Sequence, residues 1–296
     1  MKGRILNAEL SVRLRAFLSR AGFNVRLSAN ARPLDLTAVD KCNPISALYE
    51  ANGRSALVRF PLDSCIFFSH LAFPCIKGGP SPQIKTLLDY AAGRCNRWDN
   101  SDLVSFYQRF RPLNAAQLMG LDNPSNSELL SMPAGCAFLP WESKSPKELL
   151  ELEKKSAVNE ARQFGRSADV LGSQFYGPNA EEKIRLEYDR LVAAYESLRR
   201  YGHNLDFEGF GNIQALIIGL QGCYKAFILV GHHRMAALSA LGSEDVVLQI
   251  GGVSFGGYAG IEHAEHFPAV QRGLISKREA ETIFERIYHA EQPRLY

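Results

Sequence analysis

The clearest pattern of apolar and polar positions lies in the second half of the chain. Five large apolar residues follow one another at spacings of three and four: Ile184, Tyr188, Leu191, Tyr195 and Leu198. This spacing predicts a helix with one face packed on a core. Asn179 stands three residues before Glu182, in the N-x-x-E form of a capping box, and predicts where the helix begins.

Two apolar runs follow, at 214–218 and 224–230, and the glycines between them predict the turn of a β-hairpin. Gly231 ends the second run. An alanine-rich segment at 233–241 then predicts a short helix, and 246–250 predicts another buried strand. The order helix, strand, turn, strand, glycine, helix, strand indicates an α/β (α+β) fold.

The first half is less regular and is expected to be largely helical. The expected elements are an amphipathic helix near 6–18, short strands or buried segments at 55–60 and 65–73, helices that begin near Ser81 and Asn100, and a charged helix at 146–165. We therefore predict three parts. Residues 1–165 form a mixed, largely helical N-terminal domain of unknown role, 166–250 form the core, and 251–296 add a glycine-rich loop and a C-terminal helix.

Composition narrows the class of protein. The chain has 296 residues, of which 46% are hydrophobic, and its net charge is only +3. This excess of positive charge is smaller than that expected of a dedicated nucleic-acid-binding protein. The six cysteines form no CxxC pair, which argues against a zinc ribbon. No continuous apolar run suits a signal peptide or a membrane span, so a cytoplasmic location is predicted.

The segment strand, Gly231, His232, His233, Arg234, helix is a candidate anion site. The first N–H groups of a helix lack internal partners and carry partial positive charge. Glycine lets a phosphate approach the backbone, and arginine can offer it two hydrogen bonds. Histidine can donate hydrogen bonds or move protons near neutral pH. The alternative interpretation is a polar helix start with one histidine packed beneath it.

Residues 227–242, FILVGHHRMAALSALG, resemble the signature of the ParB/sulfiredoxin superfamily, and the resemblance extends over about 173–250. The most similar variant is that of the free-serine kinase branch, whose loop reads Asp-Gly-His-His-Arg; this chain has Val230 in place of the aspartate. Sulfiredoxin chemistry needs a cysteine in the loop, where this chain has His232. The resemblance implies a ParB/sulfiredoxin-like nucleotide-binding core at 166–250.

The same resemblance implies site residues. The nucleotide phosphates would be bound by Gly231, His232, His233 and Arg234. The candidate catalytic residues are Glu182, Glu187, His232 and His233, with one of the glutamates as the base. For Glu182 a capping role with Asn179 is the slightly favoured interpretation, and the two roles do not exclude each other.

The function implied is that of a small-molecule kinase, which transfers a phosphoryl group from ATP or ADP to a hydroxyl of a sugar or amino-acid-like acceptor, with Mg²⁺ bound beside the nucleotide. Two alternatives stay open: a nucleotide-sensing module without catalysis, and a ParB-like DNA-binding protein or nuclease. The third has the least support, since 251–296 shows no helix-turn-helix pattern.

A protein-bound metal is not predicted. Two histidines and two glutamates stand together at 262–266, but glycines before them and Pro268 after them favour a loop, and no distant third ligand can be named.

Overall fold

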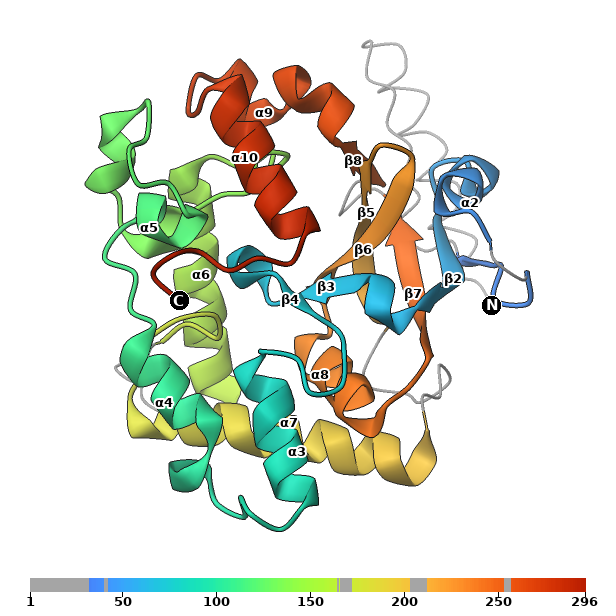
Figure 1. The fold of residues 1–296 in the computed structure, drawn as a ribbon, viewed down its shortest axis with the longest axis vertical. Helices are drawn as coiled ribbons and strands as arrows, with labels where there is room; N and C mark the ends of the chain where they lie inside the picture. The colour runs from blue at the N-terminus through green and yellow to red at the C-terminus, as the bar shows by residue number, and fades with distance from the viewer. Residues whose placement is uncertain (1–31, 40–41, 164, 166–171, 203–211, 253–256) are drawn as a thin grey trace, which may run out of the picture. The chain divides into compact units, whose positions relative to one another are not determined.

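The structure, a computed structural model, describes residues 32–39, 42–163, 165, 172–202, 212–252 and 257–296 (Figure 1). Pro33–Tyr296 forms one compact unit. The amphipathic helix predicted near 6–18 lies outside the described residues. No helix of the described part is both long enough and apolar enough to cross a membrane.

The described residues form one mixed sheet of eight strands. Their bounds are β1 Leu34–Asp35, β2 Ser55–Pro61, β3 Cys65–Phe67, β4 Phe73–Pro74, β5 Gln214–Leu220, β6 Cys223–Val230, β7 Asp245–Gly251 and β8 Tyr258–Gly260. The strand order is β1-β2-β7-β5-β6-β3-β4, and β8 pairs with β5 beside this path. Mixed pairing of this kind, with helices on the sheet, agrees with the predicted α/β (α+β) class.

The hairpin predicted in the second half is confirmed. Strands β5 and β6 are antiparallel, and Gln221 and Gly222 in the turn have φ angles of 51° and 78°. After β6 the chain enters helix α8, His232–Leu241, and returns as β7, which lies parallel to β5. The apolar runs and the glycines between them therefore predicted the ends of β5, β6, α8 and β7 to within about two residues.

The first half contributes strands to the same sheet. Strand β2 pairs antiparallel with β7 from Ser55↔Gly251 to Pro61↔Asp245, and β3 pairs parallel with β6. These additions satisfy backbone groups that the hairpin and β7 would otherwise expose at their edges. The predicted division at residue 165 thus does not separate two compact units. The apolar run 65–73, expected to be short strands or a buried segment, contains β3, a 3-10 turn and the first residue of β4.

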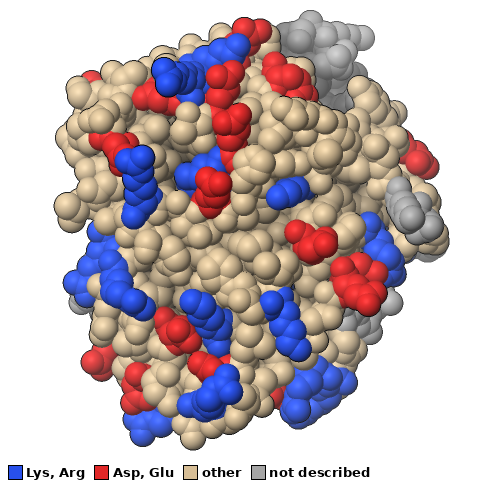
Figure 2. All heavy atoms as spheres, viewed as in Figure 1, with Lys and Arg blue, Asp and Glu red and all other residues tan. Residues whose placement is uncertain are grey.

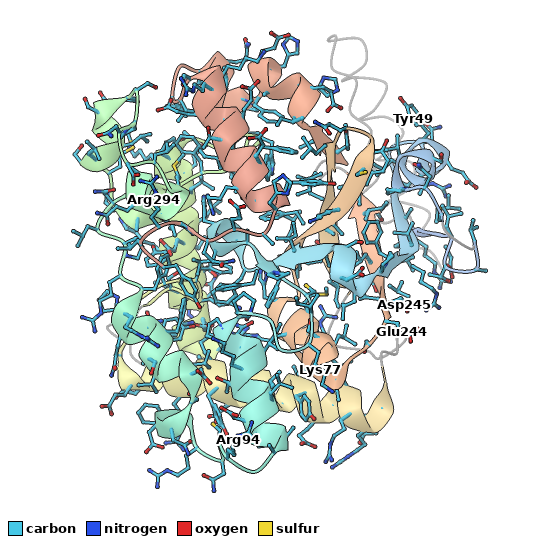
Figure 3. All side chains as sticks on the ribbon, viewed as in Figure 1. Tyr49, Lys77, Arg94, Glu244, Asp245 and Arg294 are labelled. Atoms are coloured by element: carbon cyan, nitrogen blue, oxygen red, sulfur yellow. The ribbon has the colours of Figure 1, made fainter. Side chains whose placement is uncertain are left out.

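An ion pair joins β2 and β7 at the end of their ladder. Arg59 Nη1 lies 2.8 Å from Asp245 Oδ1, and Figure 3 labels Asp245 beside β7. Both side chains are exposed, so the pair adds little stability. Figure 2 shows basic and acidic side chains interspersed on the face viewed, in keeping with the small net charge.

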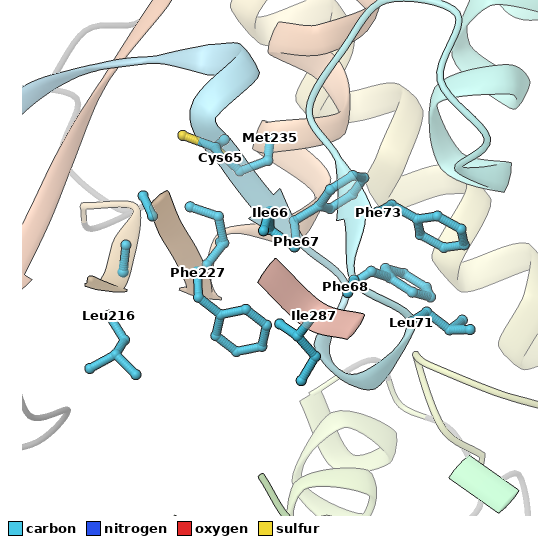
Figure 4. Packing of buried hydrophobic residues seen from close by; sticks show 14 of the residues in the cluster. Cys65, Ile66, Phe67, Phe68, Leu71, Phe73, Leu216, Phe227, Met235 and Ile287 are labelled. Carbon is cyan, nitrogen blue, oxygen red and sulfur yellow. The ribbon is translucent and has the colours of Figure 1, made fainter. Parts of the chain in front are cut away.

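Helices cover the sheet. Their bounds are α2 Pro44–Ala51, α3 Pro82–Ala91, α4 Asp102–Arg109, α5 Ala115–Met119, α6 Pro146–Gln163, α7 Glu181–Tyr201, α8 His232–Leu241, α9 Pro268–Gln271 and α10 Lys277–Tyr288. Helix α8 packs against α7 and α3 and lies between α7 and the sheet in Figure 1. The core includes Phe227 of β6, Met235 of α8 and Ile287 of α10, which Figure 4 shows together.

Two capping predictions have different outcomes. The capping box at Ser276 and Glu279 is present at the start of α10. The one predicted at Asn179 and Glu182 is wrong, because α7 begins after Ala180. The Asn179 amide instead donates a 2.7 Å hydrogen bond to the carbonyl of Ser173, which ties down the chain that leads into the helix.

Candidate functional site

The turn between β6 and α8 needs glycine. Gly231 has a φ of 103°, in the left-handed region that side chains avoid. A Cβ atom there would also lie 3.0 Å from Ile213 Cγ1 and 3.1 Å from Arg234 Nη2. The same contact shows that the half-buried guanidinium of Arg234 folds back over the turn. Burial lowers the pKa of Arg234 from its ordinary value, but an arginine at neutral pH keeps its charge.

His232, the first residue of α8, points into the protein. Only 8% of it is exposed, and its ring centroid lies 5.2 Å from that of Phe175, 6.4 Å from that of Phe68 and 6.5 Å from that of Phe67. The backbone N–H of Phe68 donates to Nδ1 at 3.2 Å. Burial, together with the neighbouring charge on His233, lowers the pKa of His232 to about 3. The imidazole is therefore neutral, with its proton on Nε2.

This position corrects the role expected for His232. A ring enclosed by three phenylalanines and bonded through Nδ1 to the backbone does not face the outer side of the turn, where a phosphate would bind. The geometry assigns His232 to holding the start of α8, the alternative that the sequence had left open for one of the two histidines.

His233, the next residue, pairs with a glutamate of α7. Its Nε2 atom lies 2.9 Å from Oε2 of Glu187, whose side chain is 0% exposed. The other carboxylate oxygen, Oε1, is 2.7 Å from Lys183 Nζ and 3.5 Å from Arg190 Nη1. Burial acts to raise the pKa of Glu187, but the His233 hydrogen bond and the charges of His233, Lys183 and Arg190 outweigh it and hold the pKa at about 2.

A second carboxylate completes this ionic cluster. Glu160, near the end of α6, places Oε2 2.5 Å from Lys183 Nζ and Oε1 2.5 Å from Arg190 Nη1. Among the described residues, two carboxylates thus face two cations, with His233 beside them. Charges this deeply placed are tolerated when they are paired and hydrogen-bonded. Lys183, with a side chain 4% exposed, depends on both glutamates.

The sequence interpretation missed the partners of Glu187. Lys183 precedes it by four residues and Arg190 follows it by three, spacings that place side chains on one face of a helix. That signal was available. Glu160 gave none, because its contact with α7 depends on how α6 packs.

The two candidate glutamates lie in different surroundings. Glu182 is exposed in the first turn of α7 and is five residues, or about 140° around the helix, from Glu187. The structure brings Glu187 to His233 and leaves Glu182 on the outer side of the helix. Of the predicted residues, Gly231, His233, Arg234 and Glu187 therefore surround the start of α8.

The described residues contain no group of three or more histidine, cysteine, aspartate or glutamate side chains that could hold a metal ion. The 262–266 segment belongs to a short 3-10 helix, Ile261–His266. There Glu262 accepts a 2.7 Å hydrogen bond from the hydroxyl of Tyr258.

Comparisons with protein-family models, with curated proteins and with solved structures each gave no match to this chain. The ParB/sulfiredoxin-like core accordingly stays a prediction based on the resemblance at residues 227–242.

Proposed function

We propose that the protein is a small-molecule kinase that transfers a phosphoryl group from ATP or ADP to a hydroxyl of a sugar or amino-acid-like acceptor. The observation that carries this proposal is the pairing of His233, in the first turn of α8, with the buried carboxylate of Glu187, beside Gly231 and Arg234. A proton acceptor and a place for phosphate then lie within one turn of each other.

The phosphate end of the site depends on the backbone. The N–H groups at the start of α8 have no partner within the helix, and the helix dipole favours negative charge there. Gly231 carries no side chain to block the approach, and Arg234 adds a permanent charge with a planar set of donors. Phosphoryl transfer depends mainly on such positioning and charge neutralisation.

His233 is the proposed base. An ionised carboxylate only accepts hydrogen bonds, so its contact with Nε2 of His233 requires the proton on that nitrogen. Nδ1 then carries the lone pair, and it makes no hydrogen bond among the described residues. In the reaction Nδ1 takes the proton of the acceptor hydroxyl, the hydroxyl oxygen bonds to the terminal phosphorus, and the bond to the leaving nucleotide breaks.

Glu187 has a supporting part in this scheme. A carboxylate whose pKa is about 2 holds a proton too weakly to act as the base near neutral pH, which was one of the roles expected for it. It instead fixes the tautomer of His233 and stabilises the imidazolium that forms, as a buried carboxylate does in other catalytic pairs. A Mg²⁺ ion bound with the nucleotide would neutralise part of the phosphate charge.

The test is a transfer assay with labelled ATP, ADP and CTP and a panel of sugars and hydroxyl amino acids. His233→Gln is expected to reduce transfer on the order of 10²- to 10⁴-fold, the usual contribution of a general base. His263→Gln is the matched control, because His263 is an exposed histidine on the 3-10 helix 261–266. Its transfer rate should equal that of the wild type.

Two outcomes would contradict the proposal. Saturable nucleotide binding without transfer to any acceptor would indicate a nucleotide sensor. Tight binding to duplex DNA, with the strong salt dependence of phosphate contacts, would favour the ParB-like alternative.

A further inference from the structure

A short segment before β4 holds an unusual backbone. Phe68, Ser69 and Ala72 have φ angles of 74°, 53° and 50°, all in the left-handed region. None of the three is glycine, and residues with a side chain disfavour this conformation. Strain of this kind persists only where surrounding contacts impose it. We call residues 68–72 the strained turn.

One end of the strained turn contacts the site. Phe68 donates its N–H to Nδ1 of His232, the buried histidine at the start of α8. Its ring is packed edge-on against Phe175 at 5.2 Å and against Phe106 at 5.7 Å between centroids. The left-handed conformation of Phe68 therefore accompanies an N–H that points at the imidazole next to the proposed base.

The other side of the strained turn is held by the C-terminal part of the chain. Arg286 Nη1 donates to the carbonyl of His70 at 2.8 Å, and the Gln292 amide donates to the carbonyl of Leu71 at 3.4 Å. These are carbonyls that a regular strand or helix would have satisfied itself.

Arg286 also reaches α5, through a 3.4 Å hydrogen bond from Nη2 to the carbonyl of Met119. Tyr296, the last residue, packs against Phe73 at 5.3 Å and Phe110 at 5.8 Å between ring centroids. We call Arg286, Gln292 and Tyr296 together the C-terminal clamp.

We propose that Phe68 is a positioning residue for the site and that the C-terminal clamp holds it in place. The clamp keeps the strained turn in its left-handed form, the Phe68 N–H then keeps His232 in one orientation and tautomer, and His232 fixes the first turn of α8. Because His233 is the next residue, a shift of His232 moves the proposed base relative to Glu187. This inference rests on the proposed kinase function of the same site.

Removal of residues 292–296 and the single change Gln292→Leu test the clamp in two steps. Two measurements are made on each variant: the ¹⁵N resonances of the His232 ring and the rate of phosphoryl transfer at saturating nucleotide. We expect the truncation to abolish the single Nε2-protonated signature of His232 and to slow transfer on the order of 10²-fold, as small displacements of a catalytic group do. Gln292→Leu should do the same to a smaller extent, with unchanged far-UV circular dichroism.

Arg294→Gln is the matched control. It lies in the same segment, and Figure 3 shows it away from the sheet; its Nη1 atom is 2.6 Å from Asp122 Oδ2, in an exposed ion pair that does not touch the strained turn. Its His232 signature and transfer rate should match the wild type.

If folded Gln292→Leu and truncated proteins both keep the His232 signature and the wild-type rate, the clamp has no positioning role. The ring resonances do not require nucleotide. A wild-type protein that transfers no phosphate would therefore overturn the proposed function, while the resonances would still decide whether the clamp orients His232.

Discussion

Two consecutive histidines at the start of α8 have opposite surroundings. His232 lies among Phe67, Phe68 and Phe175 and meets one backbone N–H. His233 points toward α7, where Glu187 binds it within the ionic cluster. The aromatic side removes charge from the imidazole, and the ionic side supplies a carboxylate that stabilises it. Identical side chains one residue apart thus have different surroundings, and in the proposed mechanism His232 positions the start of α8 while His233 takes the proton.

The contrast shows that the environment, and not the residue type, decides the role. Gly-His-His-Arg in a sequence does not distinguish the two rings. In the structure each is fixed by a partner from a distant part of the chain, Phe68 in one case and Glu187 in the other. Substitutions can test the surroundings of His232 and those of His233 separately.

The largest effect is expected on the ionic side. Glu187→Ala would leave Lys183 buried with a single partner and His233 without one, and losing one partner of a buried ion pair costs about 3–5 kcal/mol. Urea unfolding measures the free energy of unfolding. Glu181→Ala, at an exposed position in the first turn of the same helix, should change it by less than about 0.5 kcal/mol.

On the aromatic side, His232→Phe keeps a ring of similar size but removes the acceptor of the Phe68 N–H. An unsatisfied buried donor costs about 1–3 kcal/mol. The same urea titration checks this value. An unchanged midpoint and slope would show that the Phe68 hydrogen bond contributes nothing to stability.

As the pH falls, the contribution of His232 to the free energy of unfolding should be lost before that of Glu187. The pKa of His232 is about 3 when folded and 6.5 ordinarily, so its contribution is complete above pH 6.5 and declines as the pH falls toward 3. Glu187, with a folded pKa of about 2 and an ordinary value of 4.5, loses its contribution only below pH 4.5.

Within the window from pH 6.5 to 4.5, His232 alone contributes at most about 1.4 kcal/mol of unfolding free energy per pH unit. His70, whose pKa burial lowers to about 4, acts in the same direction. Unfolding free energies measured between pH 7 and 4.5 should therefore fall in the wild type and fall less steeply in His232→Phe. An equal slope in both proteins would contradict a neutral buried His232.

The smallest effect is expected at the rim of the ionic cluster. Arg190 pairs with Glu160 at 2.5 Å and with Glu187 at 3.5 Å, but its side chain is 38% exposed and water can solvate it, so Arg190→Gln should cost about 1 kcal/mol. Lys183→Gln, at a side chain 4% exposed, should cost several times as much. Equal losses of unfolding free energy at both positions would mean that burial does not determine how much each ion pair contributes.

The sequence predicted the local parts of the fold well. Strands β5, β6 and β7 and helix α8 follow from short apolar runs broken by Gly222, Gly231 and Gly242. It failed on pairings between distant segments. Nothing in the 55–61 segment indicates that it lies beside β7, and so the N-terminal half was expected to be a separate domain.

The site shows the same division. Gly231, Arg234 and Glu187 were found from a local pattern and a resemblance, and Lys183 and Arg190 could have been found from helical spacing. Phe68, Glu160 and the C-terminal clamp reach the site only through tertiary packing. The burial that makes His232 a structural residue depends on Phe67 and Phe175, which are far from it in sequence.

Polyphosphate binding at the start of α8 can be tested by a titration of ¹⁵N-labelled protein with ATP. We predict saturable shifts that are largest at the backbone amides of residues 231–234, and Arg234→Gln should weaken the binding about tenfold or more, since a charge-assisted hydrogen bond contributes ~1.5–3 kcal/mol. Saturable ATP binding that leaves the resonances of those amides unchanged, or no binding at millimolar ATP, would contradict a phosphate site at the start of α8.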